Sequence, residues 1–482
     1  MMTRIKYMIS GLVILAFLLA ACSGGQTGAT QGAPVVTAGA PETTEGAPEV
    51  TEAVSEVTEA APEATPTAET TEPAMPETGE QLGETVTVMG AWVDVEADKF
   101  LAMVAPFEEQ TGIDVEFEHP SDMIATLAER LQDGNPPDIA GLPGPGALRQ
   151  YVAEGALVPL DDVLDTARLQ QEYPEGFTDL AQVDGQTYGA FVKASVKSLI
   201  WYRPDVFQER GYQVPQTWEE LQSLEQQIIS EGATPWCIGM ESGAASGWPG
   251  TDWIEDLMLR TAGPETYDAW WQHTIPWTDP AVVTAWESWG RIVGDPAMVY
   301  GGPTSILTSR AGESSYPMFD EEPGCFLYRQ ANFITPFIQN QFPDVQVGED
   351  FNFFPFPPID EQVGNPLLVA GDLFGMFNDT PQARALMEYL TTAEAQTIWA
   401  EKGGFIAPNQ AVSPDVYPDD ISRQVAQAYV EAESVRFDAS DLMPQAVQKA
   451  FNAGVLQFVQ DPGSLQSILE DIEAAAQEAD EQ

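Results

Sequence analysis

The segment from Thr85 to Ala140 alternates strand-like and helical stretches, and this alternation constrains the fold more than any other feature. Residues 85–90 and 113–118 have the composition of strands, and residues 136–140 turn into a third. Helices are expected between them, over 97–110 with Gly112 as the C-terminal cap and over 121–133. The pattern predicts an α/β fold built on a parallel sheet.

Ligands of such sheets bind beyond the carboxyl ends of the strands. Trp92 and Glu96 follow the first expected strand, and Leu142, Pro143 and Gly144 follow the third. We therefore expect these residues at a ligand cleft. The alternative is that Trp92 is an aromatic side chain packed at the protein surface, with no role in ligand binding.

A long strand is expected over residues 186–202, and it contains two lysines. Strand alternation places Lys193 and Lys197 on one face, together with Ser195. A lysine inside an apolar strand needs a carboxylate partner, so a buried ion pair is favoured over direct ligand contact. Further strands are expected over 325–333, 351–358 and 367–377, and helices over 217–230, 280–292, 381–402, 421–434, 444–459 and 465–478.

The first 83 residues differ in character from the rest of the chain. A short basic start, an apolar stretch and the ending Leu-Ala-Ala-Cys predict a signal peptide over residues 1–21. This ending resembles a bacterial lipobox, which implies lipidation of Cys22; an ordinary secreted protein is the alternative. Residues 22–83 are rich in Thr, Glu, Pro and Ala with little to bury, so a disordered tether is expected.

The charge of the chain excludes several classes of partner. It has 75 acidic and 19 basic residues and a formal net charge of −56. Nucleic acid binding depends on Lys and Arg, and binding of anionic lipid by surface charge is equally disfavoured. His119 and His273 fit no zinc pattern, and nucleophile-elbow, phosphate-loop and dinucleotide motifs are absent. We therefore expect no metal, no cofactor and no catalytic residues.

Cys237 and Cys325 are the cysteines that remain after lipidation of Cys22. In an exported chain such a pair implies a disulfide bond. Two free buried thiols are the alternative.

Residues 241–256 combine glycines, two tryptophans and several acids. Trp248 and Trp253 lie five apart, and a helix is expected to start at Trp253 with Thr251 or Asp252 as its cap. Aromatic faces beside hydroxyl and carboxylate groups suit a sugar, which has apolar ring faces and a rim of hydroxyls. The alternative is that both tryptophans are core anchors and Asp252 is only a cap.

Several segments together resemble the extracellular solute-binding protein family 1 of bacterial ABC sugar importers, in its branch that binds α-glucosides of the trehalose, maltose or sucrose type. The matching segments are the Leu-Ala-Ala-Cys ending and residues 198–202, 215–221, 246–256, 325–333, 369–372 and 437–444. Residues 142–146 match only weakly. By resemblance, the ligand-binding residues are Trp92, Gly144, Trp248, Asp252, Trp253, Asn332, Asp372 and Asp441.

The resemblance implies a two-lobed α/β fold of the periplasmic-binding-protein kind, with a sheet flanked by helices in each lobe and the cleft between them. The first lobe is expected over about 84–196 and 363–402, the second over about 203–355 and 405–482.

The implied function is that of a monomeric, extracytoplasmic, lipid-anchored receptor, not an enzyme. It captures a neutral oligosaccharide by lobe closure and delivers it to an ABC permease. Two alternatives remain: binding of a non-sugar nutrient such as a peptide, polyol or phosphodiester, and a glycoside hydrolase using Asp252, Asp372 or Asp441.

Overall fold

The computed structural model describes residues 83–481 apart from 121, 143, 175–176 and 433. These residues belong to the second of two compact units, which begins at Glu77. The predicted signal peptide, Cys22 and nearly all of the tether lie outside the described residues. None of the helices in the described part is long and apolar enough to cross a membrane.

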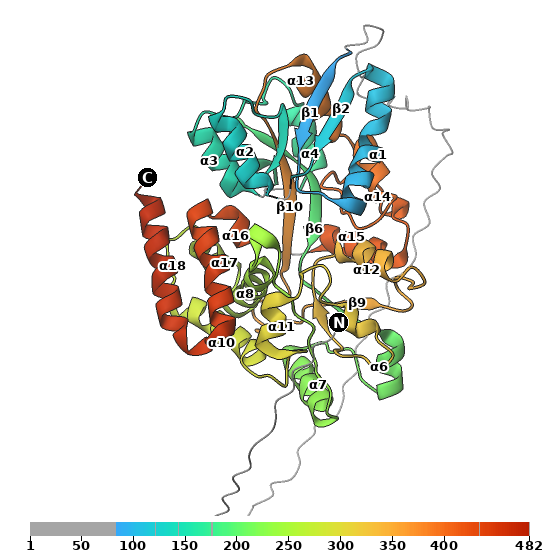
Figure 1. Ribbon diagram of the computed structural model, residues 1–482, viewed down its shortest axis with the longest axis vertical. Coiled ribbons are helices and arrows are strands. Elements are labelled where there is room, and N and C mark those ends of the chain that lie inside the picture. Colours follow the sequence, from blue (N-terminus) through green and yellow to red (C-terminus); the bar gives the residue numbers. More distant parts are fainter. Residues whose placement is uncertain (1–82, 121, 143, 175–176, 433, 482) are drawn as a thin grey trace, which may run out of the picture. The chain divides into compact units, whose positions relative to one another are not determined.

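The larger sheet has six strands. Five follow the order β11–β10–β3–β1–β2, and the sixth, β6, lies off this path and also pairs with β10. As predicted, β1 runs parallel to β2 and β3. β10 is antiparallel to β3 and β6 and runs beside β6 along its length (Figure 1). The strands are β1 Thr85–Met89, β2 Asp114–Glu118, β3 Ile139–Leu142, β6 Gly189–Val196, β10 Leu367–Met376 and β11 Val435–Phe437.

The helices predicted over 97–110 and 121–133 are found close to these positions, whereas those over 145–153, 166–172 and 177–180 were not predicted. Gly112 caps α1 in a left-handed conformation, with its N–H bonded to the carbonyl of Glu108. The expected helix over 381–402 is instead two helices, because the Thr392 side chain accepts the N–H of Ala395 and caps a new start. The bounds are α1 Asp94–Thr111, α2 Met123–Gln132, α3 Pro145–Ala153, α4 Thr166–Glu172, α5 Phe177–Leu180, α13 Pro381–Leu390 and α14 Ala393–Ala400.

A second sheet has the order β8–β7–β9, with strands Tyr328–Arg329, Leu199–Tyr202 and Asn352–Pro355. The two-stranded β4–β5 sheet pairs Gln182–Val183 with Gln186–Thr187. The remaining helices are α6 Pro204–Arg210, α7 Trp218–Ser230, α8 Trp248–Ala262, α9 Pro264–Trp271, α10 Pro280–Val293, α11 Gly302–Thr308, α12 Ile334–Gln341, α15 Asp420–Glu431, α16 Ala439–Leu442, α17 Gln445–Gln460 and α18 Leu465–Asp480. Short 3₁₀ turns cover Gly243–Ala245 (η1), Tyr316–Phe319 (η2), Pro414–Val416 (η3) and Pro462–Ser464 (η4).

The strand predicted over 186–202 is broken after Val196, and this break joins the two sheets. β6 pairs with β10 in the larger sheet, whereas β7 pairs with β8 and β9 in the smaller one. Ser198 fixes the crossing, because its hydroxyl donates to Asp256 (2.6 Å) and accepts the N–H of Leu368 (2.9 Å). Lys197 therefore lies where the chain passes from one sheet to the other.

The apolar interior forms two clusters, one around the larger sheet and one around α8, α10, α17 and α18. We call these the first and second lobes. Ring contacts fill the second: Trp270 packs against Trp277 (5.2 Å between ring centroids) and Trp286 against Phe458 (5.3 Å). The residue-level lobe boundaries given above stay a prediction.

Cys237 and Cys325 form the predicted disulfide bond, with 5.5 Å between their Cα atoms. Both are buried. The bond closes a segment of 88 residues that includes α8, α9 and α10. It therefore restricts the unfolded chain over a large part of the second lobe.

Replacing both cysteines with alanine is expected to lower the free energy of unfolding by about 4–5 kcal/mol, because closing so long a loop removes much chain entropy from the unfolded state. Chemical denaturation of the oxidised protein and of Cys237→Ala/Cys325→Ala measures the difference. Peptide mapping without reductant should recover one cross-linked peptide; two alkylatable thiols in native protein would contradict the bond.

Candidate functional site

A cavity of about 1000 Å³ lies at the carboxyl ends of β1 and β3 and extends to α16 and α17 of the second lobe. The first lobe lines it with residues after β1, at the end of β3, on α2 and on α3. Its aromatic and acidic lining includes Trp92, Tyr151, Trp248, Phe374, Asp372, Asp438 and Asp441. The position agrees with the general rule for ligands of open α/β sheets.

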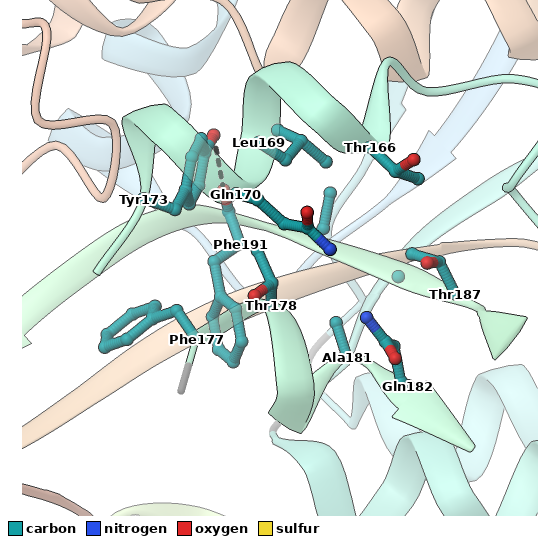
Figure 2. Close-up of a pocket in the computed structure, with 12 residues that line it drawn as sticks. Thr166, Leu169, Gln170, Tyr173, Phe177, Thr178, Ala181, Gln182, Thr187 and Phe191 are labelled. Atoms are coloured by element: carbon teal, nitrogen blue, oxygen red, sulfur yellow. Dashed lines mark hydrogen bonds between the residues drawn. The ribbon is translucent and has the colours of Figure 1, made fainter. Parts of the chain in front are cut away.

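A second pocket, between α4, α5 and β6, is too small to compete as a ligand site. It holds about 20 Å³, room for one water molecule, and apolar side chains such as Leu169 and Phe177 line much of it (Figure 2). The Tyr173 hydroxyl donates to the carbonyl of Phe191 at its edge (3.3 Å). The large cavity is therefore the candidate functional site.

Trp248 reaches the cavity because α8 begins five residues earlier than the sequence suggested. Gly247, at φ 111°, precedes the helix, and Pro249 occupies its first turn, where a missing N–H costs nothing. A side chain at Gly247 would clash with the Asn452 carbonyl, since its Cβ would lie 2.5 Å away. Thr251 and Asp252 lie inside the helix, so the predicted cap was wrong.

Trp253 does not line the cavity, which corrects its prediction as a ligand residue. It is 1% exposed and packs edge-on against Trp236 (4.9 Å between centroids) and Phe356 (5.7 Å). Five residues on a helix turn the side chain by roughly 140° from that of Trp248. Trp248 is half-buried and lines the cavity. Trp253 is a core anchor, which the alternative interpretation had expected for both tryptophans.

Asp252 and Asn332 also belong to the interior and not to the cavity wall. Asp252 is fully buried and accepts from Lys197 (2.9 Å) and Arg329 (3.0 Å). The Asn332 side-chain oxygen accepts the N–H of Val196 (2.8 Å). These partners use the oxygens that we expected to bind ligand.

Gly144 lies beside the cavity wall, where it allows α3 to approach α16. A Cβ at Gly144 would meet both the Cβ and the carbonyl oxygen of Asp441 at 2.7 Å. Gly144 is thus a packing contact of Asp441. Trp92, Trp248, Asp372 and Asp441 line the cavity, and their contact with ligand stays a prediction.

Both strand lysines have carboxylate partners, as predicted. Lys193 bonds to Glu96, which therefore lies behind the cavity wall. The Lys197 ammonium lies 2.9 Å from both Asp252 and Asp438 and 5.0 Å from the centre of the Trp248 ring. Unlike Lys193, Lys197 also lines the cavity.

Four acids meet near Lys197, namely Asp252, Glu255, Asp438 and Asp441, and their pKa values shift in different directions. Burial favours the neutral form of Asp438, but the Lys197 ammonium outweighs it and lowers the pKa of Asp438 to about 2. Burial, and next the charge of Asp438, raise the pKa values of Glu255 and Asp441 well above their usual range. Carboxylate oxygens of Asp252, Glu255 and Asp438 lie within 4.8 Å of one another, a spacing that could hold a metal ion, but the Lys197 ammonium already binds two of them.

Sequence reasoning missed the cavity residues on α2 and α17. The cavity is also lined by Met123, Ile124 and Leu131 on α2 and by Gln445 and Gln448 on α17. The signal on α17 was its polar residues at 445, 448 and 452, which share one helix face. That face could equally have been solvated.

Comparison with known proteins decides the family. A family model described as bacterial extracellular solute-binding protein matches residues 102–427 of the chain. The chain belongs to this family. It is 44% identical to the osmoprotective compounds-binding protein GgtB of Synechocystis sp. over 78% of this chain and 88% of GgtB. It is 39% identical to the alpha-glucosides-binding periplasmic protein AglE of Rhizobium meliloti over 78% of this chain and 83% of AglE.

Solved structures share the two-lobed fold of this solute-binding protein at low sequence identity. A chitin oligosaccharide binding protein superposes with a TM-score of 0.71 at 19% identity, covering 83% of this chain and all of that one. Maltose-bound MalE3 of T. maritima gives a TM-score of 0.64 at 17% identity, over 82% and 99% of the two chains. The predicted periplasmic-binding-protein-like α/β fold is thereby confirmed.

The two tryptophans of α8 should separate binding from stability. Trp248→Ala is expected to weaken ligand binding about tenfold or more while lowering the free energy of unfolding by less than about 2 kcal/mol, the range of a cation–π contact. Trp253→Ala should cost about 3–5 kcal/mol of stability, as core aromatic truncations do. Calorimetric titration and denaturant unfolding measure the two effects; the reverse assignment would contradict the geometry.

Glu255 should make stability depend on pH. Its pKa is higher in the folded protein than in the unfolded chain, so its contribution is fully present below the unfolded value and is lost as pH rises toward the folded value. Glu255→Gln keeps the acceptor for the N–H of Ser440 (3.1 Å) and cannot ionise. Relative to wild type, the variant is expected to gain stability as pH rises above about 4.5; an unchanged difference across pH 4–8 would contradict a raised pKa.

Proposed function

We propose that this protein captures a neutral oligosaccharide of the α-glucoside kind and delivers it to an ABC permease. The observation that carries the proposal is the combination of an indole face and acidic acceptors on one cavity wall. Trp248 offers its ring, and Asp372 and Asp441 offer carboxyl groups. A pyranose presents an apolar face to the first and hydroxyl donors to the second.

Asp372 and Asp441 each have one carboxyl oxygen to which no described residue donates a hydrogen bond. Asp372 uses one oxygen, Oδ2, for the indole N–H of Trp92 (3.1 Å), and no other described residue donates to Oδ1. Asp441 accepts the side-chain amide of Gln448 (3.0 Å) at Oδ1, and within the described chain nothing donates to Oδ2. Two open oxygens on one wall therefore favour a ligand rich in hydroxyl groups.

The charges of the cavity favour a neutral sugar over an anionic one. Among the described residues, its wall contains five acids and two lysines, Lys197 and Lys449. Lys197 is already bound to Asp252 and Asp438. A phosphorylated or acidic sugar needs Arg or Lys as a partner and would meet mostly negative charge. A non-sugar anion such as a phosphodiester is disfavoured for the same reason.

One of the two relatives supports the same ligand class. AglE is named for α-glucosides, and GgtB for osmoprotective compounds. A ligand bound between lobes stabilises the closed form and shifts the population toward it, which is the signal a permease can recognise. No chemical step is needed, so we propose a binding protein and not a glycoside hydrolase, although Asp372 and Asp441 are a pair of carboxyl groups in one cavity.

The location follows from the family and from the start of the chain. The family is extracellular. We further propose that the protein is a monomer held to the cell membrane by a lipid on Cys22, with residues 23–83 as the tether. Support for the anchor is the lipobox-like Leu-Ala-Ala-Cys ending. Cys22→Ser should release the protein from the membrane fraction without changing its ligand affinity.

Calorimetry with trehalose, maltose, sucrose and a phosphorylated disaccharide at two salt concentrations tests the ligand class. We expect binding of at least one neutral disaccharide, with affinity nearly independent of salt, because no ionic contact forms. Tightest binding of the phosphorylated sugar, with affinity falling steeply as salt rises, would contradict the proposal. Incubation with α-glucosides should give no turnover; release of glucose would favour the hydrolase.

A further inference from the structure

Lys193 places a buried positive charge directly behind the cavity wall. It lies on β6 and is 4% exposed. Its ammonium bonds to Glu96 of α1 and lies 3.7 Å from Oδ2 of Asp372. The rings of Trp92, Phe333 and Trp399 surround it, with their centroids 5.6–5.9 Å from the nitrogen. Lys193 itself does not line the cavity, whereas Asp372 and Trp92 do.

The backbone fixes the pairing of Lys193 with Asp372. The two residues are direct partners across the antiparallel β6–β10 pair, and the register shifts immediately after Asp372. Oppositely charged residues at such positions attract each other across the strands. β6 and β10 are also the long strands that run side by side through the fold (Figure 1). The position of the Asp372 carboxylate is therefore set from a rigid element.

Asp372 in turn fixes the position of the Trp92 side chain. Its Oδ2, the oxygen nearest to Lys193, accepts the indole N–H of Trp92 at 3.1 Å. Occupation of Oδ2 by both groups leaves Oδ1 for a ligand. A series of contacts thus runs from Glu96 through Lys193 to Asp372 and Trp92, and its last two members are on the cavity wall.

We propose that Lys193, held by Glu96, is a positioning residue that sets the strength of sugar binding by orienting Asp372 and Trp92. This inference rests on the proposed function. Without the ammonium, the carboxylates of Glu96 and Asp372 repel each other, and Asp372 loses the charge that holds Oδ2 away from the cavity. The effect on ligand is indirect, through the orientation of Oδ1.

A charge-neutral variant tests the proposal without leaving a buried charge unpaired. Lys193→Met/Glu96→Gln removes both members of the ion pair together, since loss of one alone strands its partner. Arg168→Met/Glu172→Gln is the matched control, because it also removes both members of an ion pair of the first lobe (3.0 Å) and neither residue lines the cavity. Thermal melting establishes that each variant is folded.

The first readout needs no ligand. The indole ¹H–¹⁵N resonance of Trp92, assigned with Trp92→Phe, reports its hydrogen bond to Asp372. We expect this resonance to move in Lys193→Met/Glu96→Gln and to stay in Arg168→Met/Glu172→Gln. An unmoved resonance in the first variant would overturn the positioning role, whatever the protein binds.

The second readout is affinity for trehalose, maltose and sucrose, measured by calorimetry in a double-mutant cycle with Asp372→Asn. Lys193→Met/Glu96→Gln should weaken binding about 10- to 100-fold, the range of one hydrogen bond to a charged group. In the Asp372→Asn background the same change should weaken binding only roughly a few-fold, because the group that Lys193 orients is already altered. Equal losses in both backgrounds would overturn the inference.

The two proposals fail in different ways. If wild type binds none of the three sugars, the proposed function falls while the Trp92 resonance still decides whether Lys193 positions the wall. If wild type binds one of them and the cycle is additive, the function stands and the positioning role does not. A loss of affinity in Arg168→Met/Glu172→Gln equal to that in the test variant would also count against a specific role of Lys193.

Discussion

The buried ammonium group of Lys197 is the interaction on which the rest of the structure depends. It lies where the chain leaves the larger sheet for the smaller one, and it bonds at 2.9 Å to Asp252 on α8 and to Asp438 just before α16. Arg329 extends this ion network to Asp256. Such networks add little net stability, but removing one partner costs roughly 3–5 kcal/mol because a buried charge is left alone. The network therefore acts to fix geometry.

Several basic side chains of the protein are bound inside the fold, and this determines what the cavity can recognise. Lys193, Lys197 and Arg329 are each bound to carboxylates of the chain itself. Besides Lys449, the wall offers an indole face and acids with open oxygens, which suit hydroxyl donors. Lys193 and Lys197 also contact two of the aromatic residues of the wall, since their ammonium groups lie 5.9 Å from the Trp92 ring and 5.0 Å from the Trp248 ring. The same charged groups therefore hold the fold together and determine which ligands the cavity can bind.

The sequence predicts features that depend on local pattern and fails where distant partners decide. The alternation from Thr85 to Ala140 gives β1, α1, β2, α2 and β3 in order, because turn and cap residues are local signals. That Lys197 needed a carboxylate could be predicted; that Asp438, 241 residues away, supplies one could not. Trp248 and Trp253 looked equivalent in the sequence, and the start of α8 directly after Gly247 determines which of them faces the core.

The most direct test of this account is a crystal structure of the protein with the neutral disaccharide that it binds most tightly. The account predicts one sugar ring against the Trp248 indole, with hydroxyl groups within hydrogen-bonding distance of Asp372 and Asp441 and with Lys197 still bound to Asp252 and Asp438. A sugar bound away from Trp248, or one whose hydroxyl groups are held by Asp252 in place of Lys197, would contradict it.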